Sequence, residues 1–222
     1  MNLRSDFFQK IYIPFFVIFY LIWAIAELII RPALNTIVPD GSVLSCLLFD
    51  GILKNLCWTL PAWILMTKFD QNLYIHKKEL LTQKADLKEV IPVFLGVAGF
   101  CILNSVIAHR GFYFQLEDLP ECTAFLFVGI TEEFVFRGFL LNATLTDQNQ
   151  PYAVAINAIL FLSIHFPIWI LYGNFMLYFQ NFGFVMILLL SVFFSWCMLY
   201  FKNIWVSVGV HMLWDILVTL LN

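Results

Sequence analysis

The stretch GITEEFVFRGFL, residues 129–140, places Glu132, Glu133 and Arg137 inside an otherwise apolar run. Such a run suits lipid or a buried core, and a charged residue at mid-bilayer costs about 2.5–3.5 kcal/mol even on a lenient insertion scale. Charged residues that are present in spite of this cost are candidates for function, each with a partner to be identified. The residues around the stretch decide which environment applies.

The chain has the composition of a membrane protein. Of its 222 residues, 62% are hydrophobic and 12% are charged, whereas soluble domains are about 45–50% apolar and about 25% charged. The apolar residues come in runs of about 20, which match the hydrocarbon core of a bilayer at about 1.5 Å rise per helical residue. Backbone polar groups must be satisfied within each segment there, so each run is predicted to be a helix. The predicted fold class is all-α, a polytopic transmembrane helical bundle.

Seven spans are predicted from the apolar runs. They cover about residues 11–30, 43–66, 90–109, 121–142, 151–172, 182–201 and 204–221. An eighth, re-entrant or split segment stays open, because the second run could break near Asp50 and Lys54. We divide the chain into an N-terminal part, residues 1–89, with two helices and a polar cytoplasmic loop over residues 67–89, and a core over residues 90–222.

The placement of lysine and arginine predicts the orientation. With a cytoplasmic N-terminus, only Arg31 and Arg110 fall on the outer side, while Lys54 and Arg137 lie within spans. The other basic residues are then cytoplasmic, namely Arg4, Lys10, Lys68, Lys77, Lys78, Lys84, Lys88 and Lys202. The positive-inside rule therefore predicts a cytoplasmic N-terminus and an outer C-terminus. The first apolar run continues past AIA, residues 24–26, which resembles a signal-peptide cleavage site, so an uncleaved first helix is expected.

Net charge and cysteine usage exclude several other classes of protein. The formal charge is −3 and no basic face is present, so a nucleic-acid partner is not expected. Five cysteines are scattered singly over hydrophobic segments without a CxxC motif, which argues against disulfides and against a thiolate metal cluster. The lipid bilayer is the first partner that the sequence predicts.

Helical geometry separates the three charges of the opening stretch. At about 100° per residue, Glu133 and Arg137 lie on one helical face, in the favourable order of an acid before a base. Glu132 points about 100° away from this pair. We therefore predict a Glu133–Arg137 ion pair and a Glu132 carboxylate that is left free for chemistry. The alternative is that all three residues only hold helices together through buried polar contacts.

Two later spans contain histidines with a partner four residues away. FLSIHF, residues 161–166, contains Phe161 and His165, and HMLWD, residues 211–215, contains His211 and Asp215. A histidine and a carboxylate at this spacing can ligate a metal, or the carboxylate can orient the imidazole. Each histidine could equally serve in packing between helices.

Together with Glu132, the two histidines provide the parts needed to activate water. These parts are a base, a group that orients it, and donors to a developing oxyanion. Because water must reach Glu132, we expect a hydrated cavity that opens toward the cytoplasmic side among the fourth, fifth and seventh spans.

The three motifs resemble, in order and spacing, those of a known family. EEFVFR (residues 132–137), FLSIH (161–165) and HMLWD (211–215) are similar to the pattern EExxxR, FxxxH and HxxxN or HxxxD. This pattern is typical of the CPBP family of intramembrane proteases, which includes CAAX proteases and bacteriocin-processing enzymes and is also called Abi. The resemblance covers about residues 90–222, and residues 1–89 carry no diagnostic motif.

The resemblance implies peptide-bond hydrolysis within the membrane. The implied catalytic residues are Glu132 with His165, which would activate the attacking water, and His211 with Asp215, which would stabilise the oxyanion. Glu133, Arg137 and Phe161 would shape the site. Asp215 stands where eukaryotic CAAX proteases carry asparagine. An ionised aspartate cannot donate to an oxyanion, so Asp215 would have to be protonated, orient His211 or hold a cation.

Metal dependence stays open at this point. No HExxH zinc motif is present. If a cation such as Zn2+ is used, its candidate ligands are His165, His211 and Asp215, whereas a glutamate base requires no cofactor. We prefer the metal-independent route, because the three ligands match no established short zinc motif.

The expected substrate is a membrane-associated peptide or protein. The short chain and its Phe-, Ile- and Lys-rich composition suggest the plasma membrane of a bacterium, and the resemblance then implies bacteriocin processing or self-immunity. The alternatives are a non-enzymatic immunity or scaffold protein of the membrane, or a proton-coupled transporter that uses the same carboxylates and histidines. The chain lacks the internal symmetry that is frequent in transporters.

Overall fold

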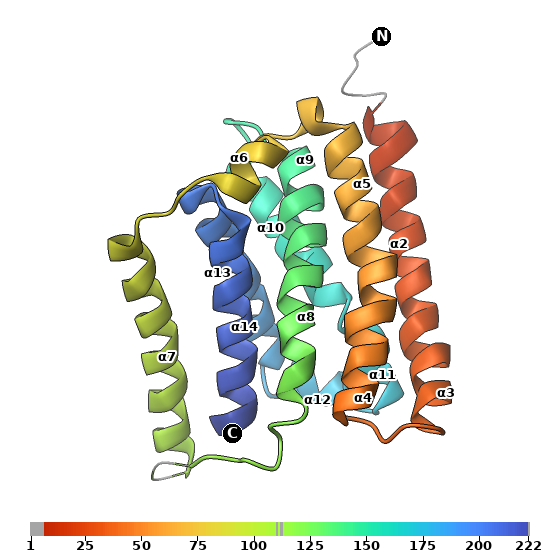
Figure 1. Cartoon of the computed structure of the whole chain (residues 1–222), viewed down its shortest axis with the longest axis vertical. Coiled ribbons are helices and arrows are strands. Elements are labelled where there is room, and N and C mark those ends of the chain that lie inside the picture. Colours follow the sequence, from red (N-terminus) through yellow and green to blue (C-terminus); the bar gives the residue numbers. More distant parts are fainter. Residues whose placement is uncertain (1–6, 110, 112, 222) are drawn as a thin grey trace.

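In the described part of the chain, all regular secondary structure is helical, which confirms the predicted fold class. In this computed structural model the described residues are 7–109, 111 and 113–221. Arg4 and Arg110, which enter the orientation argument, lie outside them. Figure 1 shows the helices as upright rods, and rods that follow one another in the chain run in opposite directions.

Six rods in the described ranges are long and apolar enough to cross a bilayer. They are Phe8–Asn35, Val43–Lys68, Leu87–His109 (α7), Gln150–Leu171, Gly183–Phe201 (α13) and Ile204–Leu221 (α14). One further rod, which we call the charged rod, comprises α8 (Cys122–Glu133), the π-helix η6 (Phe134–Leu141) and α9 (Asn142–Thr144). It contains the GITEEFVFRGFL stretch, whose charges set it apart. The rods follow the predicted runs in order, and six of the seven predicted spans are long and apolar enough to cross a bilayer.

The first two rods consist of shorter helices in direct succession. The first contains η1 (Phe8–Tyr12), α2 (Ile13–Ile25), η2 (Ala26–Ile30) and α3 (Arg31–Asn35). The second contains α4 (Val43–Cys46), η3 (Leu47–Leu53), η4 (Asn55–Thr59) and α5 (Leu60–Lys68). Asp50 and Lys54, where a break was considered, lie in continuous helical conformation, with Asp50 inside π-helical η3. Single π-helical turns are frequent at functional sites.

The fifth predicted span is interrupted at His165. The helix α10 (Gln150–Ser163) ends before Ile164 and His165, which form a turn, and α11 (Phe166–Leu171) follows. Pro167 lacks the N–H that would bond the carbonyl of Ser163, and its ring crowds that carbonyl, so a regular α-helix cannot continue. The predicted uninterrupted helix over residues 151–172 is corrected to two helices joined at His165.

The remaining helices are short connections. They are η5 (Asp70–Asn72), α6 (Lys77–Thr82) and α12 (Phe175–Gln180). The polar loop over residues 67–89 is fastened to the charged rod, because the side-chain amide of Asn142 bonds the N–H and the carbonyl of Ile75 at 2.7 and 2.8 Å. Leu80 in this loop is fully buried.

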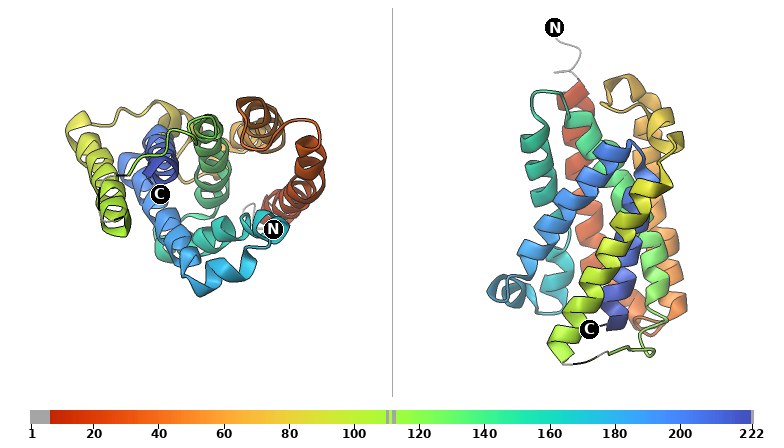
Figure 2. Two further views of the ribbon diagram at one scale, coloured as in Figure 1. Left: turned by 90° about the horizontal axis from the view of Figure 1, so that it is seen from below. Right: turned by 90° about the vertical axis from the view of Figure 1, so that its left-hand side faces the viewer.

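The charged rod occupies the centre of the bundle. α8 packs against α14 on one side and against η3 and η4 of the second rod on the other, and α7 packs on α14 at the edge (Figure 2). All eight residues of η6 are buried. The charged rod is therefore enclosed by other helices, and its charged side chains must find partners on them.

Candidate active site

The predicted Glu133–Arg137 ion pair is present in the centre of the bundle. Both side chains are fully buried, and Arg137 Nη1 donates to Glu133 Oε1 at 3.0 Å. Arg137 Nη2 donates to the carbonyl and the hydroxyl of Ser191 on α13, at 3.0 and 2.8 Å. The guanidinium also lies over the ring of Phe161, 4.3 Å from its centroid, a favourable cation–π position. These contacts tie the charged rod to α10 and α13.

Glu133 has two further partners on α14 that the sequence pattern did not predict. Its Oε1 lies 2.8 Å from Nδ1 of His211, and its Oε2 accepts a hydrogen bond from the hydroxyl of Ser207 at 2.5 Å. Because an ionised carboxylate only accepts, Nδ1 of His211 carries the proton. A carboxylate in this position fixes the tautomer and the orientation of the imidazole.

Glu132 is paired with Lys54, so the prediction of a free carboxylate is wrong. Lys54 Nζ lies 2.7 Å from Glu132 Oε1, and both side chains are buried. The ammonium group is 5.0 and 4.6 Å from the ring centroids of Trp23 and Trp58. Lys54 belongs to the second rod, 78 residues away in sequence. Helical spacing identifies partners on the same helix and could not identify this one.

His211 lies among three carboxylates. Besides the contact of its Nδ1 with Glu133, its Nε2 is 3.4 Å from Asp215 Oδ2 and 3.8 Å from Glu132 Oε2. The ring of Phe194 stacks on the imidazole with a centroid distance of 4.5 Å. Three of the four residues with an implied catalytic role, Glu132, His211 and Asp215, are therefore in one cluster.

His165 and Glu132 line the same cavity. Its Nδ1 is 3.1 Å from the carbonyl oxygen of Phe161, and because a carbonyl only accepts, Nδ1 carries the proton. In the neutral ring, Nε2 is then the acceptor. His165, Glu132 and Lys54 all line a cavity of about 210 Å³. The Phe161 ring packs against both His165 and His211 in T-shaped geometry, at 5.5 and 5.8 Å between centroids.

This cavity lies toward the end of the bundle opposite Phe8, where the first rod begins. It adjoins a second cavity of about 340 Å³, and both are lined by Arg31, Asp50 and Glu121. These residues lie near the end of the bundle where α8 begins, at the bottom of Figure 1. For a cytoplasmic N-terminus this is the outer side, so the two expectations of a cytoplasmic N-terminus and a cytoplasmic opening do not hold together. The walls come from the first two rods, α8 and the α10–α11 turn, because the first rod packs beside that turn.

The arrangement does not form the zinc site that the sequence left open. Among residues 7–109, 111 and 113–221, no group of three or more His, Cys, Asp or Glu side chains is placed to hold a metal ion. Nδ1 of His165 contacts a backbone carbonyl, and Nδ1 of His211 contacts Glu133, so Nε2 is the nitrogen of each ring that remains for water or substrate. Within the described ranges, His165, His211 and Asp215 are not grouped around one point.

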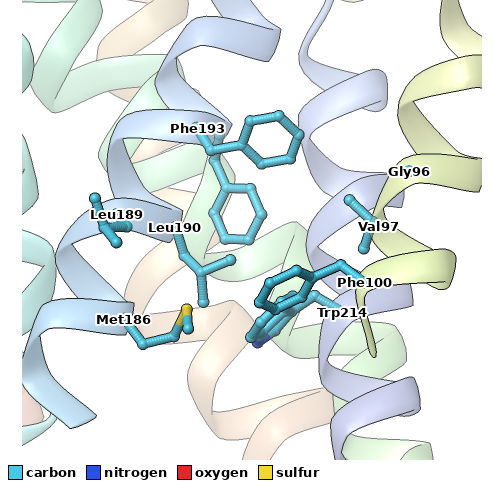
Figure 3. Close-up of a pocket in the computed structure, with 9 residues that line it drawn as sticks. Gly96, Val97, Phe100, Met186, Leu189, Leu190, Phe193 and Trp214 are labelled. Carbon is cyan, nitrogen blue, oxygen red and sulfur yellow. The ribbon is translucent and has the colours of Figure 1, made fainter. Parts of the chain in front are cut away.

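A separate apolar groove of about 210 Å³ lies among α7, α13 and α14 (Figure 3). Its lining contains no charged side chain and includes Phe100, Phe193 and Trp214. Phe194 also lines this groove and stacks on His211. The Phe194 ring therefore forms a wall between the groove and the candidate site.

Comparison with known protein families points to the same part of the chain. The family model described as Type II CAAX prenyl endopeptidase Rce1-like matches residues 122–217. Neither the curated proteins nor the solved structures give a match. The matched segment contains all three motifs, from Glu132 to Asp215. Residues 122–217 are therefore similar to the Rce1-like CAAX proteases, which confirms the predicted resemblance to the CPBP family of intramembrane proteases.

Proposed function

We propose that this protein is an intramembrane endopeptidase that hydrolyses a peptide bond with a water molecule activated by Glu132. The match over residues 122–217 supports a CAAX-type intramembrane endopeptidase. The position of Glu132 supports the finer part of the proposal, which is the activation of water by this residue. It lines one cavity with His165, and its Oε2 lies 3.8 Å from Nε2 of His211. We expect the Glu132→Gln protein to fold normally and to leave its substrate uncut.

In the proposed reaction, Glu132 accepts a proton from water while the water oxygen attacks the scissile carbonyl. Lys54 holds Oε1 and neutralises the carboxylate in the apolar interior, which leaves Oε2 for the water. Nε2 of His165 orients the same water. The carbon–nitrogen bond then breaks, and the proton on Glu132 passes to the leaving amine. No step requires a group other than the side chains and water.

The oxyanion that forms in this reaction would be stabilised by His211 and Asp215. Nε2 of His211 donates to it when that nitrogen is protonated, and the side chain of Asp215 donates when it is neutral. Glu133 fixes the ring of His211 through Nδ1, so Nε2 points at a defined position. Such pre-oriented donors contribute most to the stabilisation of developing charge.

A pair of substitutions at Asp215 tests this role. Asp215→Asn is expected to retain activity, because asparagine supplies an N–H donor as well as an oxygen that accepts from His211. Asp215→Ala is expected to lower kcat by about 10²–10³-fold, the usual cost of losing one oxyanion donor. The measurement is kcat for both purified variants at equal thermal stability. A loss in the asparagine variant as large as in the alanine variant would show that the charge of Asp215 is required, against the donor role.

We further propose that the protein lies in the plasma membrane of a bacterium with its N-terminus in the cytoplasm. Lys68, Lys77 and Lys202 all lie near the end of the bundle from which the chain starts, and basic residues favour the cytoplasmic side. The cavity at Glu132 then opens to the outside. A protease whose cavity receives its substrate peptide from the outer face would suit a role in bacteriocin processing or self-immunity.

Thiol labelling tests the cavity and the orientation together. In a protein whose five native cysteines are replaced, Ala124→Cys is expected to react with a membrane-impermeant thiol reagent added to intact cells, because Ala124 lines both adjoining cavities. Leu126→Cys is the matched control on the same helix. Leu126 is 51% exposed on the outside of the bundle, where lipid should prevent the reaction. Labelling of Ala124→Cys in inverted membranes alone would overturn the orientation, and protection in both preparations would overturn the hydrated cavity.

A further inference from the structure

The cavity that ends at Glu132 has more carboxylates than cations in its walls. The two adjoining parts are lined by the acidic residues Glu27, Asp40, Asp50, Glu121 and Glu132 and by the basic residues Arg31 and Lys54. The outer part has a volume of about 340 Å³, and one water molecule takes about 30 Å³ of liquid volume. The space therefore accommodates a side chain of a ligand.

Both cations are already engaged with carboxylates of the same walls. Arg31 donates two hydrogen bonds to Glu27, at 2.6 and 3.1 Å, and Lys54 is paired with Glu132 at 2.7 Å. Asp40 lies 4.0 Å from Arg31 and accepts a hydrogen bond from the hydroxyl of Tyr172. Among the residues that the structure describes, Asp50 and Glu121 are the two acidic wall residues that form no ion pair.

Asp50 is the more informative of these two residues. Its side chain lines both parts of the cavity, and the residue is only 7% exposed. Across residues 7–109, 111 and 113–221, its carboxylate has neither a hydrogen bond nor an ion pair. Arg31 and Lys54 attract this carboxylate only from beyond hydrogen-bond distance, so a largely buried acceptor is left without a donor, which costs free energy. A donor placed in the cavity would remove this cost. The position of Asp50 therefore points to a ligand that brings a positive charge and N–H groups.

Glu121 adds to the same electrostatic field at the mouth of the cavity. It directly precedes α8. The carboxylates of Asp118 and Asp40 add further negative charge around Glu121. The crowding of carboxylates makes the ionised form unfavourable, and a bound cation would relieve it.

We propose that this cavity binds a lysine or arginine side chain of the peptide substrate, with Asp50 and Glu121 as its partners. The proposal names the substrate class for the proposed protease, a peptide with a basic residue close to the bond that is cleaved, and to that extent rests on the proposed function. A basic side chain suits the site because its apolar stem can pass the hydrophobic wall at Ala124 and Ile168 while its head reaches Asp50.

Paired peptide pools test this inference. Both pools carry a fluorescent label and are random except at one fixed position, which holds arginine in one pool and the isosteric, uncharged citrulline in the other. The protein is held in nanodiscs of uncharged phosphatidylcholine, binding is measured by fluorescence anisotropy, and cleavage is measured in the same samples. Wild-type protein is expected to bind the arginine pool at least about tenfold more tightly, as a charge-assisted hydrogen bond would give.

The variants that test the two partners are Asp50→Asn and Glu121→Gln, each of which is expected to lower the preference for arginine by several-fold. Glu117→Gln is the matched control, because Glu117 is exposed at the same end of the bundle and does not line the cavity. Equal binding of the two pools by wild type, or an unchanged preference in both variants, would overturn the inference. Glu121 is exposed, so its variant gives an answer even where Asp50→Asn does not fold.

The two readouts separate this inference from the proposed function. Preferential binding of arginine without cleavage of either pool would support the cation site and count against the protease. Cleavage of both pools at one rate with equal binding would support the protease and overturn the cation site.

Discussion

Replacing Glu133 by glutamine is expected to destabilise the bundle by about 3–5 kcal/mol, the usual cost of removing one partner from a buried ion pair. Glu133 is fully buried and contacts Arg137, His211 and Ser207. Glutamine leaves the positive charge of Arg137 without a counter-charge in the apolar interior. The measurement is the free energy of unfolding in detergent micelles with increasing dodecyl sulfate. Glu121→Gln, at an exposed position, serves as the control and is expected to stay within about 0.5 kcal/mol of wild type.

A double variant shows whether the ion pair is the cause. Arg137→Met combined with Glu133→Gln removes both charges, and replacing a buried pair by uncharged residues is often neutral. We therefore expect the double variant to be more stable than Glu133→Gln alone. A Glu133→Gln protein as stable as the Glu121→Gln control would contradict a structural role of the ion pair.

Replacing Glu132 by glutamine is expected to lower kcat by about 10²–10⁴-fold, the usual contribution of a general base. Glutamine keeps the shape of the side chain, and its carbonyl oxygen can still accept the hydrogen bond from Lys54, but it cannot take a proton from water. The measurement is single-turnover cleavage by purified protein, with dodecyl sulfate unfolding as the check on folding. Glu132→Asp keeps the carboxylate on a shorter side chain and is expected to retain intermediate activity. Full activity in a folded Glu132→Gln protein would remove Glu132 from the chemistry.

The helical rods could be predicted from the sequence because the constraint that a bilayer imposes is local. A run of about 20 apolar residues must satisfy its backbone within itself, and each run led to a rod close to its predicted bounds. The break at His165 was missed although Pro167 signalled it, because the hydrophobicity of the run continues through the turn. A hydropathy pattern records length and polarity but not the loss of one backbone hydrogen bond.

The candidate site was predictable where its contacts lie within one helix. The Glu133–Arg137 pair and the neighbourhood of His211 and Asp215 follow from a spacing of four residues. The partner of Glu132 depends on how the second rod packs against α8, which spacing does not contain. Lys54 nevertheless carried a signal, because it is a charge inside an apolar run, and such charges call for a partner.

Two other features of the site could not be predicted from the sequence. Ser191 and Ser207, which bond Arg137 and Glu133, are small polar residues of a kind that is common at helix interfaces in membranes. The direction of the cavity depends on the first rod, which lies beside the α10–α11 turn and contributes Trp23 to the cavity wall. Such packing between distant segments decides which end of the bundle admits water.

The most direct test of Glu132-dependent peptide hydrolysis is a quantitative comparison of peptide N-termini in membranes from cells that contain equal amounts of wild-type or Glu132→Gln protein. The account predicts at least one membrane-associated peptide or protein that is cut in wild-type cells and accumulates uncut in the Glu132→Gln strain. It also predicts that purified wild-type protein produces the same new N-terminus from that substrate. Identical sets of N-termini in the two strains, with both proteins folded and in the membrane, would contradict it.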